Sequence, residues 1–371
     1  MTSDTSENGG RVSRRKYLAA VGAAGSLAVT GTATAQDGGN QGPLKIGGSS
    51  TVYPITSQAG AVWNSNPPAS DAEYWGPGEW NIDTEMNYAD FWASRYGFES
   101  GQGLPFNVTV GLSHSGTGLE KLRGGVLDIG DASATVAQEF PDDSEEELNK
   151  FVDHVVGVDA QPLVVSKEIY DAGVTELTLQ QVQQIYRGEL TNWSELDAYD
   201  GEDKEIQAIG RAEGSGTDTS FRANVLGGPN APMEGVDVRK GQNQQVQTLV
   251  ANSNNAVAYM ALAFVDEERV PPVALTIEDT TYEYGKNLGA KDYPLNRDLH
   301  CYTWEDTSPK EAAFILTMLS DMGQERYVAA NNYVKLPTNR QEQQVAKLPE
   351  PEQGTLQDYI GASDQTTTTS E

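Results

Sequence analysis

The chain has 371 residues and a single cysteine, Cys301, so its length allows two domains and its composition excludes an intramolecular disulfide. Aspartate and glutamate number 54 against 25 lysines and arginines, and the net charge of −29 argues against nucleic acid and anionic membranes as partners. The acidic residues are scattered, which is typical of a solvated surface in high salt and favours a halophilic archaeal source. The three histidines form no metal-ligand pattern, so we expect neither a metal nor another cofactor.

The first predicted element is an export signal in residues 1–35. Ser13–Leu18 contains a twin-arginine pattern, the apolar stretch Ala19–Thr32 follows it, and Ala33–Ala35 has the small residues of a cleavage site. The alternative is an N-terminal amphipathic anchor, because the apolar stretch is short for a membrane span. We expect cleavage before Gln36, a mature chain with a net charge near −31, and a location outside the cytoplasmic membrane.

Three short loops rich in glycine and hydroxyl groups each follow a predicted strand and precede a predicted helix. They are Gly47–Pro54, Ser113–Gly118 and Gly210–Thr217. A helix start has N–H groups without partners and a positive dipole end, and ligands of open α/β sheets bind at the carboxyl ends of strands. The repeated pattern therefore predicts several helix starts that converge on one small anion.

The third of these loops adds a fixed positive charge. Arg211 supplies a planar guanidinium that suits a tetrahedral oxyanion, and Ser215 and Thr217 supply hydroxyls where a helix begins, which we expect at Thr219. A chain this acidic cannot attract an anion over long range, so binding must depend on local N–H groups and Arg211. The alternative is an ordinary capped helix start with Arg211 paired to Glu213.

Residues 67–105 are unusual because they hold three of the six tryptophans. This segment is longer than an ordinary connection, which indicates either a function or a cluster of its own. One interpretation is a docking surface for a partner at the membrane. The other is a local aromatic cover over the first domain.

Later segments indicate where the chain passes between domains. Val155–Val158 and Leu163–Val165 are predicted strands of the first crossing, and the prolines of Val270–Pro272 are predicted to mark the return. Ser308–Met322 is a predicted helix with a serine cap and Pro309 at its first position. The end of the chain is rich in proline, glutamate and threonine, which predicts disorder.

Five stretches together resemble the phosphate-binding protein of the ABC phosphate importer. The similarity runs from Leu44 to about Pro337, in the order of that family. The stretches are Gly48–Pro54, Ser115–Gly118, Asp128–Ser133, Leu190–Leu196 and Arg211–Thr217.

The resemblance implies an α/β, two-lobed periplasmic-binding-protein-like fold of type II, with the ligand between lobes that two strands join. Lobe 1 would comprise residues 42–160 and 268–348, with the insertion 67–105, and lobe 2 residues 161–267. Residues 349–371 would form a disordered tail. The implied function is capture of inorganic phosphate and its delivery to an ABC permease by a monomer that is not an enzyme.

The resemblance also implies a set of phosphate-binding residues from both lobes. In this set, Asp131 is the candidate acceptor for the proton of phosphate, although relatives carry Ala-Ser-Asp or Ser-Arg where this chain has Ala132–Thr135. The implied residues are Ser50, Thr51, Val52, Ser115, Asp131, Ser133, Arg211, Ser215, Gly216 and Thr217. A plain cap or turn aspartate is the alternative for Asp131.

Two other functions fit parts of the pattern. A receptor for sulfate or molybdate would share the fold and the helix starts but would need no proton acceptor. A secreted phosphatase would need a nucleophile with a base, and only His114 beside Ser113 and Ser115 suggests one.

The charge predicts that the fold depends on salt. Lowering potassium chloride from about 1 M to about 0.1 M lengthens electrostatic screening from about 3 Å to about 10 Å and should lower the unfolding temperature steeply. Calorimetry of the purified chain across this range provides the measurement. An unchanged midpoint would count against the halophilic interpretation.

Overall fold

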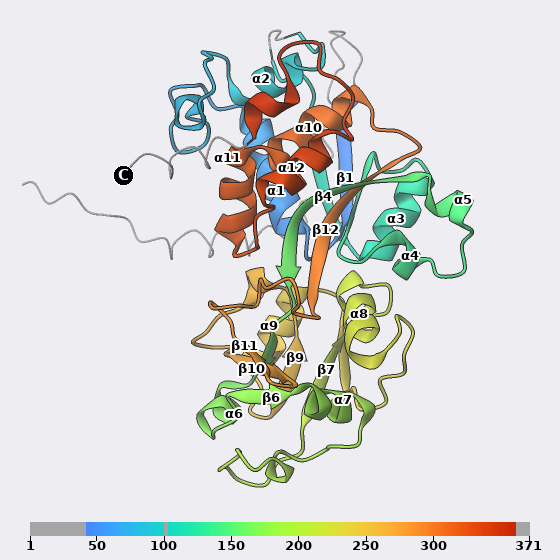
Figure 1. The fold of residues 1–371 in the computed structure, drawn as a ribbon, viewed down its shortest axis with the longest axis vertical. Coiled ribbons are helices and arrows are strands. Elements are labelled where there is room, and N and C mark those ends of the chain that lie inside the picture. The colour runs from blue at the N-terminus through green and yellow to red at the C-terminus, as the bar shows by residue number, and fades with distance from the viewer. Residues whose placement is uncertain (1–41, 100–102, 361–371) are drawn as a thin grey trace, which may run out of the picture. The chain divides into compact units, whose positions relative to one another are not determined.

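Two β-sheets organise residues 42–99 and 103–360, which are the residues that the computed structural model describes (Figure 1). The first sheet has the strand order β2-β1-β3-β12-β4. Its strands are β1 (Leu44–Ser49), β2 (Val108–Ser113), β3 (Ile129–Ala132), β4 (Phe151–Ala160) and β12 (Asn296–Trp304). Strand β1 is parallel to β2 and β3, so the carboxyl ends of these three strands meet at one edge.

The second sheet has the strand order β11-β10-β5-β9-β7-β8, and β6 pairs with β10. Its strands are β5 (Leu163–Val165), β6 (Glu176–Thr178), β7 (Gln207–Arg211), β8 (Val238–Lys240), β9 (Ala256–Tyr259), β10 (Pro272–Ile277) and β11 (Thr280–Tyr282). Strand β7 is parallel to β8 and β9, so Arg211 lies at a carboxyl-end edge. We call the parts built on the first and second sheets lobe 1 and lobe 2.

Helices cover both sheets. They are α1 (Tyr53–Ser65), α2 (Tyr88–Ser94), α3 (Ser115–Arg123), α4 (Val136–Glu139), α5 (Glu145–Leu148), α6 (Lys167–Asp171), α7 (Leu179–Arg187), α8 (Gly216–Phe221), α9 (Asn243–Ala251), α10 (Pro309–Leu319), α11 (Asp321–Gly323) and α12 (Thr338–Val345). Helix α10 begins as predicted, because Ser308 accepts a hydrogen bond from the Glu311 N–H and Pro309 occupies the first turn.

The chain passes from lobe 1 to lobe 2 between β4 and β5. Strand β4 ends at Ala160 in the first sheet, and β5 begins at Leu163 in the second. The chain returns through β12, which pairs with β4 along its length (Figure 1). Two antiparallel strands therefore connect the lobes.

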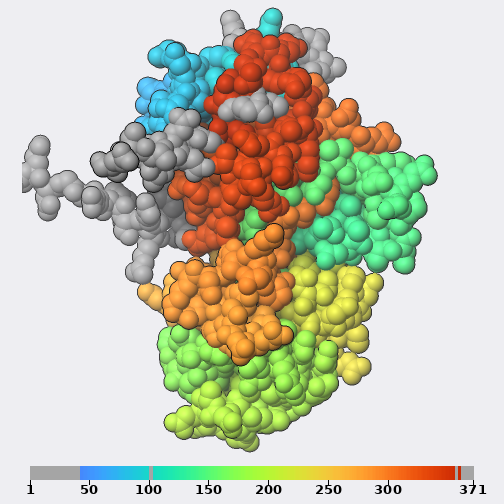
Figure 2. All heavy atoms as spheres, in the orientation of Figure 1, coloured from blue at the N-terminus to red at the C-terminus, as the bar shows by residue number. Residues whose placement is uncertain are grey.

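The predicted position of the return, at residue 268, is wrong. Strand β10 remains in lobe 2, where it pairs with β5 and β6, and Figure 2 shows this orange segment against the green surface of lobe 2. Pro272 is the first residue of β10, a position where proline costs no ladder hydrogen bond, so the proline run starts a strand of lobe 2. Lobe 2 thus extends to Leu295, and lobe 1 resumes at β12.

The aromatic insertion is packed inside lobe 1. Trp75 and Trp92 are fully buried, and their rings lie 6.0 Å apart. Tyr88 and Phe91 complete the cluster, with ring centroids 5.3 and 5.4 Å from Trp75. This packing supports the aromatic cover rather than an exposed docking surface.

The predicted disorder of residues 349–371 is wrong for residues 349–360. The Glu352 N–H donates to the Arg95 carbonyl at 2.7 Å, and Tyr359 is buried against Phe91 and Trp92. A single aromatic ring is enough to hold this otherwise polar segment, because it joins an existing aromatic cluster. Residues 1–35 and 361–371 of the predicted signal and tail lie outside the described residues.

The packing of residues 349–360 through Tyr359 should contribute to the stability of the fold. Tyr359→Ala should lower the free energy of unfolding by about 2–4 kcal/mol, because it removes a buried ring from the cluster. Denaturant unfolding at high salt measures this. Val126→Ala is the control, because Val126 is 57% exposed and its loss should cost less than about 1 kcal/mol. Equal losses would contradict the docking of the segment.

Candidate functional site

The loop after β1 brings hydroxyl and N–H groups to the edge of the first sheet. Ser50 and Thr51 follow the strand, and α1 begins after Val52 without a side-chain cap. No acceptor is recorded among the described residues for the Val52 N–H. Gly48 is required here, because a Cβ at this residue would lie 2.2 Å from the Asp131 carbonyl oxygen. The glycine therefore lets β1 and β3 approach closely beside a helix start.

The loop after β7 does the same from lobe 2. Ser215 is the N-cap of α8, which starts at Gly216 and so three residues before the predicted start at Thr219. The Gly216 N–H donates to Ser115 Oγ at 3.2 Å, and a Cβ at Gly216 would lie 2.4 Å from that oxygen. Glycine thus allows the starts of α8 and α3 to meet.

Side chains of the two lobes bond directly to one another. Thr51 Oγ1 and Thr217 Oγ1 are 3.0 Å apart, and an Arg211 guanidinium N–H donates to Ser50 Oγ at 3.0 Å. Ser133 lies beside this interface, because its N–H donates to Ser115 Oγ at 3.2 Å. We call the set the lobe interface; it consists of Ser50, Thr51, Val52, Ser115, Ser133, Arg211, Ser215, Gly216 and Thr217.

Nine of the ten residues implied by the resemblance thus lie at or directly beside the lobe interface, and Asp131 does not. Its carboxylate accepts hydrogen bonds from Thr56 Oγ1 at 2.8 Å and from Cys301 Sγ at 3.5 Å. Burial raises the pKa of Asp131 to about 7. Asp131 lies within β3, where its carboxylate is held by α1 and β12, whereas Ser133 follows the end of the strand.

Arg211 carries a buried positive charge without a carboxylate partner among the described residues. Its guanidinium donates to Asn243 Oδ1 at 2.7 Å, to the Gly241 carbonyl at 2.7 Å and to the Lys240 carbonyl at 3.2 Å. Burial lowers the pKa of Arg211 to about 10, so it stays protonated at neutral pH. The predicted alternative, an Arg211–Glu213 pair, is therefore not formed. A buried cation with neutral acceptors only is an arrangement that an anion stabilises.

Asn243 is a site residue that the sequence analysis missed. It is the first residue of α9, and its amide nitrogen donates to Ser50 Oγ and Thr51 Oγ1, each at 3.2 Å. Its amide oxygen accepts from Arg211, so the amide orients the guanidinium toward Ser50. The sequence contains a signal for it, because Gln242–Gln245 is a run of polar side chains that can cap a helix start.

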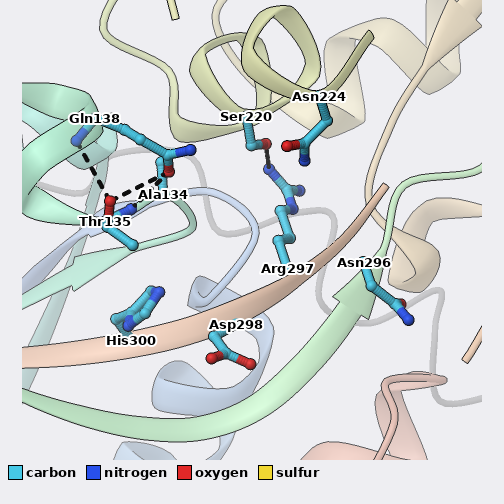
Figure 3. Close-up of a pocket in the computed structure, with 9 residues that line it drawn as sticks. All are labelled: Ala134, Thr135, Gln138, Ser220, Asn224, Asn296, Arg297, Asp298 and His300. Carbon is cyan, nitrogen blue, oxygen red and sulfur yellow. Dashed lines mark hydrogen bonds between the residues drawn. The ribbon is translucent and has the colours of Figure 1, made fainter. Parts of the chain in front are cut away.

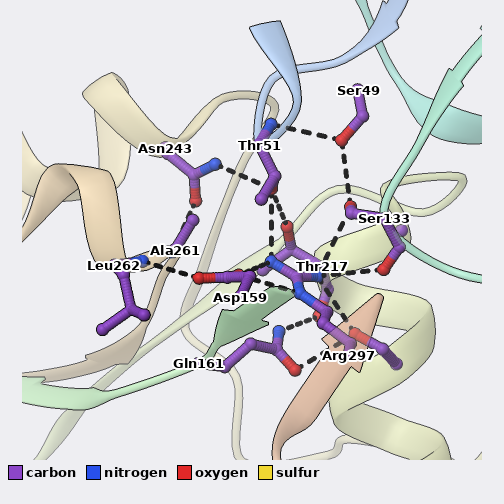
Figure 4. Close-up of polar contacts among 12 residues, drawn as sticks. Ser49, Thr51, Ser133, Asp159, Gln161, Thr217, Asn243, Ala261, Leu262 and Arg297 are labelled. Atoms are coloured by element: carbon purple, nitrogen blue, oxygen red, sulfur yellow. Dashed lines mark hydrogen bonds and ion pairs between the residues drawn. The ribbon is translucent and has the colours of Figure 1, made fainter. Parts of the chain in front are cut away.

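Arg297 and Asp159 were also missed. They face one another across β12 and β4, and their closest nitrogen and oxygen are 2.6 Å apart in a pair that is almost completely buried (Figure 4). Arg297 donates to Thr51 Oγ1 at 3.2 Å and to Ser220 Oγ at 3.1 Å, so it contacts both lobes. No local pattern marks this pair, because its members are 138 residues apart in the chain.

A cavity of about 200 Å³ lies behind Arg297 (Figure 3). Its ionisable lining groups all have partners: Arg297 pairs with Asp159, Asp298 with Arg340 at 2.8 Å, and His300 with Asp153 at 2.8 Å. Because its charges are already paired, the cavity would attract an anion less strongly than the unpaired Arg211 guanidinium does. Within the described ranges, no group of three or more His, Cys, Asp or Glu side chains is arranged to hold a metal.

The chain is similar in sequence to a family of known proteins. The model of the PBP superfamily domain matches residues 86–322. The phosphate-binding protein PstS of Bacillus subtilis is 27% identical over 228 residues, which are 62% of this chain and 71% of the relative. PstS of Staphylococcus saprophyticus is 24% identical over 251 residues, with 65% and 75% covered.

Solved structures share the fold. A Clostridium perfringens substrate-binding protein with bound phosphate has a TM-score of 0.59 at 21% identity, and the alignment covers 80% of this chain and all of the other. An ABC-type phosphate transport receptor from Vibrio cholerae has a TM-score of 0.52 at 21% identity, with 79% of this chain and all of the other covered. At this identity the likeness establishes the two-lobed fold.

The contrast between the two arginines generates a prediction. Asp159→Asn should lower the free energy of unfolding by about 3–5 kcal/mol, because it leaves a second buried guanidinium without a counter-charge. Asp143→Asn is the control, because Asp143 pairs with Arg123 at 2.7 Å on the surface, where such a pair contributes less than about 1 kcal/mol. Denaturant unfolding of both variants measures the difference. Similar losses would mean that the Arg297 charge is not held by Asp159.

Proposed function

This chain belongs to the PBP superfamily, and from that premise we propose that it captures inorganic phosphate outside the cytoplasmic membrane and delivers it to an ABC import permease. The observation that carries the proposal is the Arg211 guanidinium, which is 1% exposed and has only neutral acceptors. A phosphate oxyanion would supply the missing negative charge. The named function of the Bacillus and Staphylococcus relatives supports phosphate as the ligand.

The lobe interface supplies the remaining interactions of a tetrahedral anion. Arg211 would bind one or two oxygens as a planar fork. Thr51 and Thr217 would turn their hydroxyls from one another toward the ligand, since the two oxygens lie 3.0 Å apart. Ser50 Oγ, which lies 3.0 Å from an Arg211 guanidinium nitrogen, would provide a third hydroxyl. The N–H groups of Val52 and Thr217 would donate hydrogen bonds to further oxygens of the anion. Neither N–H has an acceptor among the described residues.

Closure follows from the same contacts. Ser50 and Thr51 belong to lobe 1, whereas Arg211 and Thr217 belong to lobe 2, so an anion between them would hold the lobes together. The two strands that join the lobes, β4 and β12, would form the hinge. Arg297 lies on one of them and contacts Thr51, so it would position the hydroxyl of Thr51 and add positive potential.

Asp131 is not part of the proposed site, because Thr56 and Cys301 hold its carboxylate. A receptor for sulfate or molybdate therefore remains the second candidate, since among the described residues no carboxylate contacts the Arg211 guanidinium to accept a ligand proton. A phosphatase is disfavoured by geometry: Ser115 Oγ accepts the N–H groups of Gly216 and Ser133 rather than contacting the His114 ring.

The proposal includes the cellular setting. We propose further that the chain is exported through the twin-arginine route, is a monomer and comes from a halophilic archaeon. It would act as a binding protein rather than an enzyme. Among the described residues, no helix is of the length and apolar character that a membrane crossing requires. The signal that would direct export lies outside the described residues.

Substitution of Arg211 tests the proposal. Arg211→Ala should weaken phosphate binding by about 30- to 1,000-fold, because truncating one partner of a buried charged contact costs about 2–4 kcal/mol. Isothermal titration at molar chloride with phosphate, arsenate and sulfate measures affinity and selectivity together.

Two variants serve as controls in the same titrations. Arg123→Ala removes a partly exposed arginine that pairs with Asp143, and Asp131→Asn alters the buried carboxylate outside the site. Both should keep the native affinity within about threefold and the native ratio of phosphate to sulfate. Sulfate that binds more tightly than phosphate would establish the second candidate instead. Unchanged phosphate affinity in Arg211→Ala would refute the site.

A further inference from the structure

Glu139 is a half-buried carboxylate that the proposed site does not use. It ends α4 in lobe 1 and faces α8 of lobe 2, where the Thr219 hydroxyl hydrogen-bonds to it. Its Oε2 lies 2.9 Å from the position that a Cβ of Gly116 would occupy, and the Gly116 N–H, which donates to the Gly214 carbonyl at 3.2 Å, also lowers the pKa of the carboxylate. Its other oxygen, Oε1, is buried and has no hydrogen-bond partner among the described residues.

The charged groups around Glu139 do not neutralise it. Asp218 on α8 raises the pKa of Glu139 but pairs with Arg222 and Arg239, and Arg297 on β12 lowers that pKa but pairs with Asp159. Tyr302, also on β12, is neutral because burial raises its pKa well above the usual value. Burial is the largest influence, and it raises the pKa of Glu139 from 4.5 to about 7.

We propose that Glu139 carries a proton when the two lobes are closed and that this protonated carboxylic acid acts as a clasp between α4 and α8. The geometry gives the reason. An ionised Glu139 would leave Oε1 as an unpaired buried charge beside Asp218. It would also lie next to the starts of α3 and α8, where the anion of the proposed function binds, and would repel it.

The sign of the pH dependence follows from this arrangement. In an open form Glu139 contacts water and titrates near 4.5, whereas in the closed form it titrates near 7. The closed form therefore gains stability from the proton that is fully present below the lower value and is lost as the pH rises through the upper one. Binding of an anion should accordingly take up a proton between these values.

The test compares Glu139→Gln with the native chain, because glutamine resembles the protonated acid in shape but does not titrate. Phosphate affinity is measured by titration from about pH 5 to about pH 8 at molar chloride. The protonation of phosphate itself affects both proteins equally, so the ratio of their affinities isolates Glu139. The native affinity should fall relative to that of Glu139→Gln by at least about tenfold across this range and level off above about pH 7.5.

Glu147→Gln is the matched control, because Glu147 lies on α5 with its side chain 43% exposed and pairs only with Lys150. Its affinity ratio to the native chain should be independent of pH. A ratio for Glu139→Gln that stays constant within about twofold would overturn the clasp. This inference rests on the proposed function, but the failures differ: absence of phosphate binding at every pH refutes the function, whereas intact binding with parallel pH profiles refutes only the clasp.

A second measurement uses the native chain alone. Infrared difference spectra on addition of phosphate near pH 6.5 should show the carbonyl band of a newly protonated carboxylic acid, because closure raises the pKa of Glu139 through this pH. The band should be absent in Glu139→Gln. A difference spectrum of the native chain without the band would contradict the proposal even if the variant failed to fold.

Discussion

The buried guanidinium of Arg211 is the constraint on which the proposed site depends. Four neutral oxygens surround it, from Ser50, Lys240, Gly241 and Asn243, so its hydrogen bonds are satisfied while its charge is not. Carrying a bare charge in the interior costs several kcal/mol, and such an arrangement is retained where a ligand supplies the opposite charge. The net charge of −29 strengthens this argument, because a distant anion is repelled and affinity must come from groups in direct contact.

Arg297 is a second buried arginine beside the same interface, and its charge is neutralised. Arg297 is held by Asp159 and still donates to Thr51, so one arginine of the two is available to a ligand and the other organises the loop beside it. Glu139 completes the charge balance, since its protonated form adds no negative charge where an anion binds. Among Arg211, the Arg297–Asp159 pair and a protonated Glu139, one positive charge thus lacks a counter-charge, which suits a small anion.

Local patterns were sufficient to predict the loops, because a strand, a hydroxylated glycine loop and a helix start are all encoded within about ten residues. The loops that hold Ser50, Ser115 and Thr217 were predicted this way, whereas the choice of Ser50 and Ser115 within them followed from the resemblance. Arg297 and Asp159 could not be predicted from local patterns, since they meet only through the pairing of β12 with β4. The return at residue 268 was misplaced for a similar reason, because proline at the start of a strand resembles a boundary. The sequence also could not show that Thr56 and Cys301 hold the Asp131 carboxylate, since both come from distant elements that meet β3 only in the fold.

The most direct measurement is the position of the anion itself. Crystals of the mature chain grown with arsenate, whose arsenic is located by its anomalous signal, should place the anion between the lobes. The account predicts its oxygens within about 3 Å of the Arg211 guanidinium and of the Thr51 and Thr217 hydroxyls. An anion bound elsewhere, or one between the lobes that does not contact Arg211, would contradict the claim that the unpaired guanidinium creates the site.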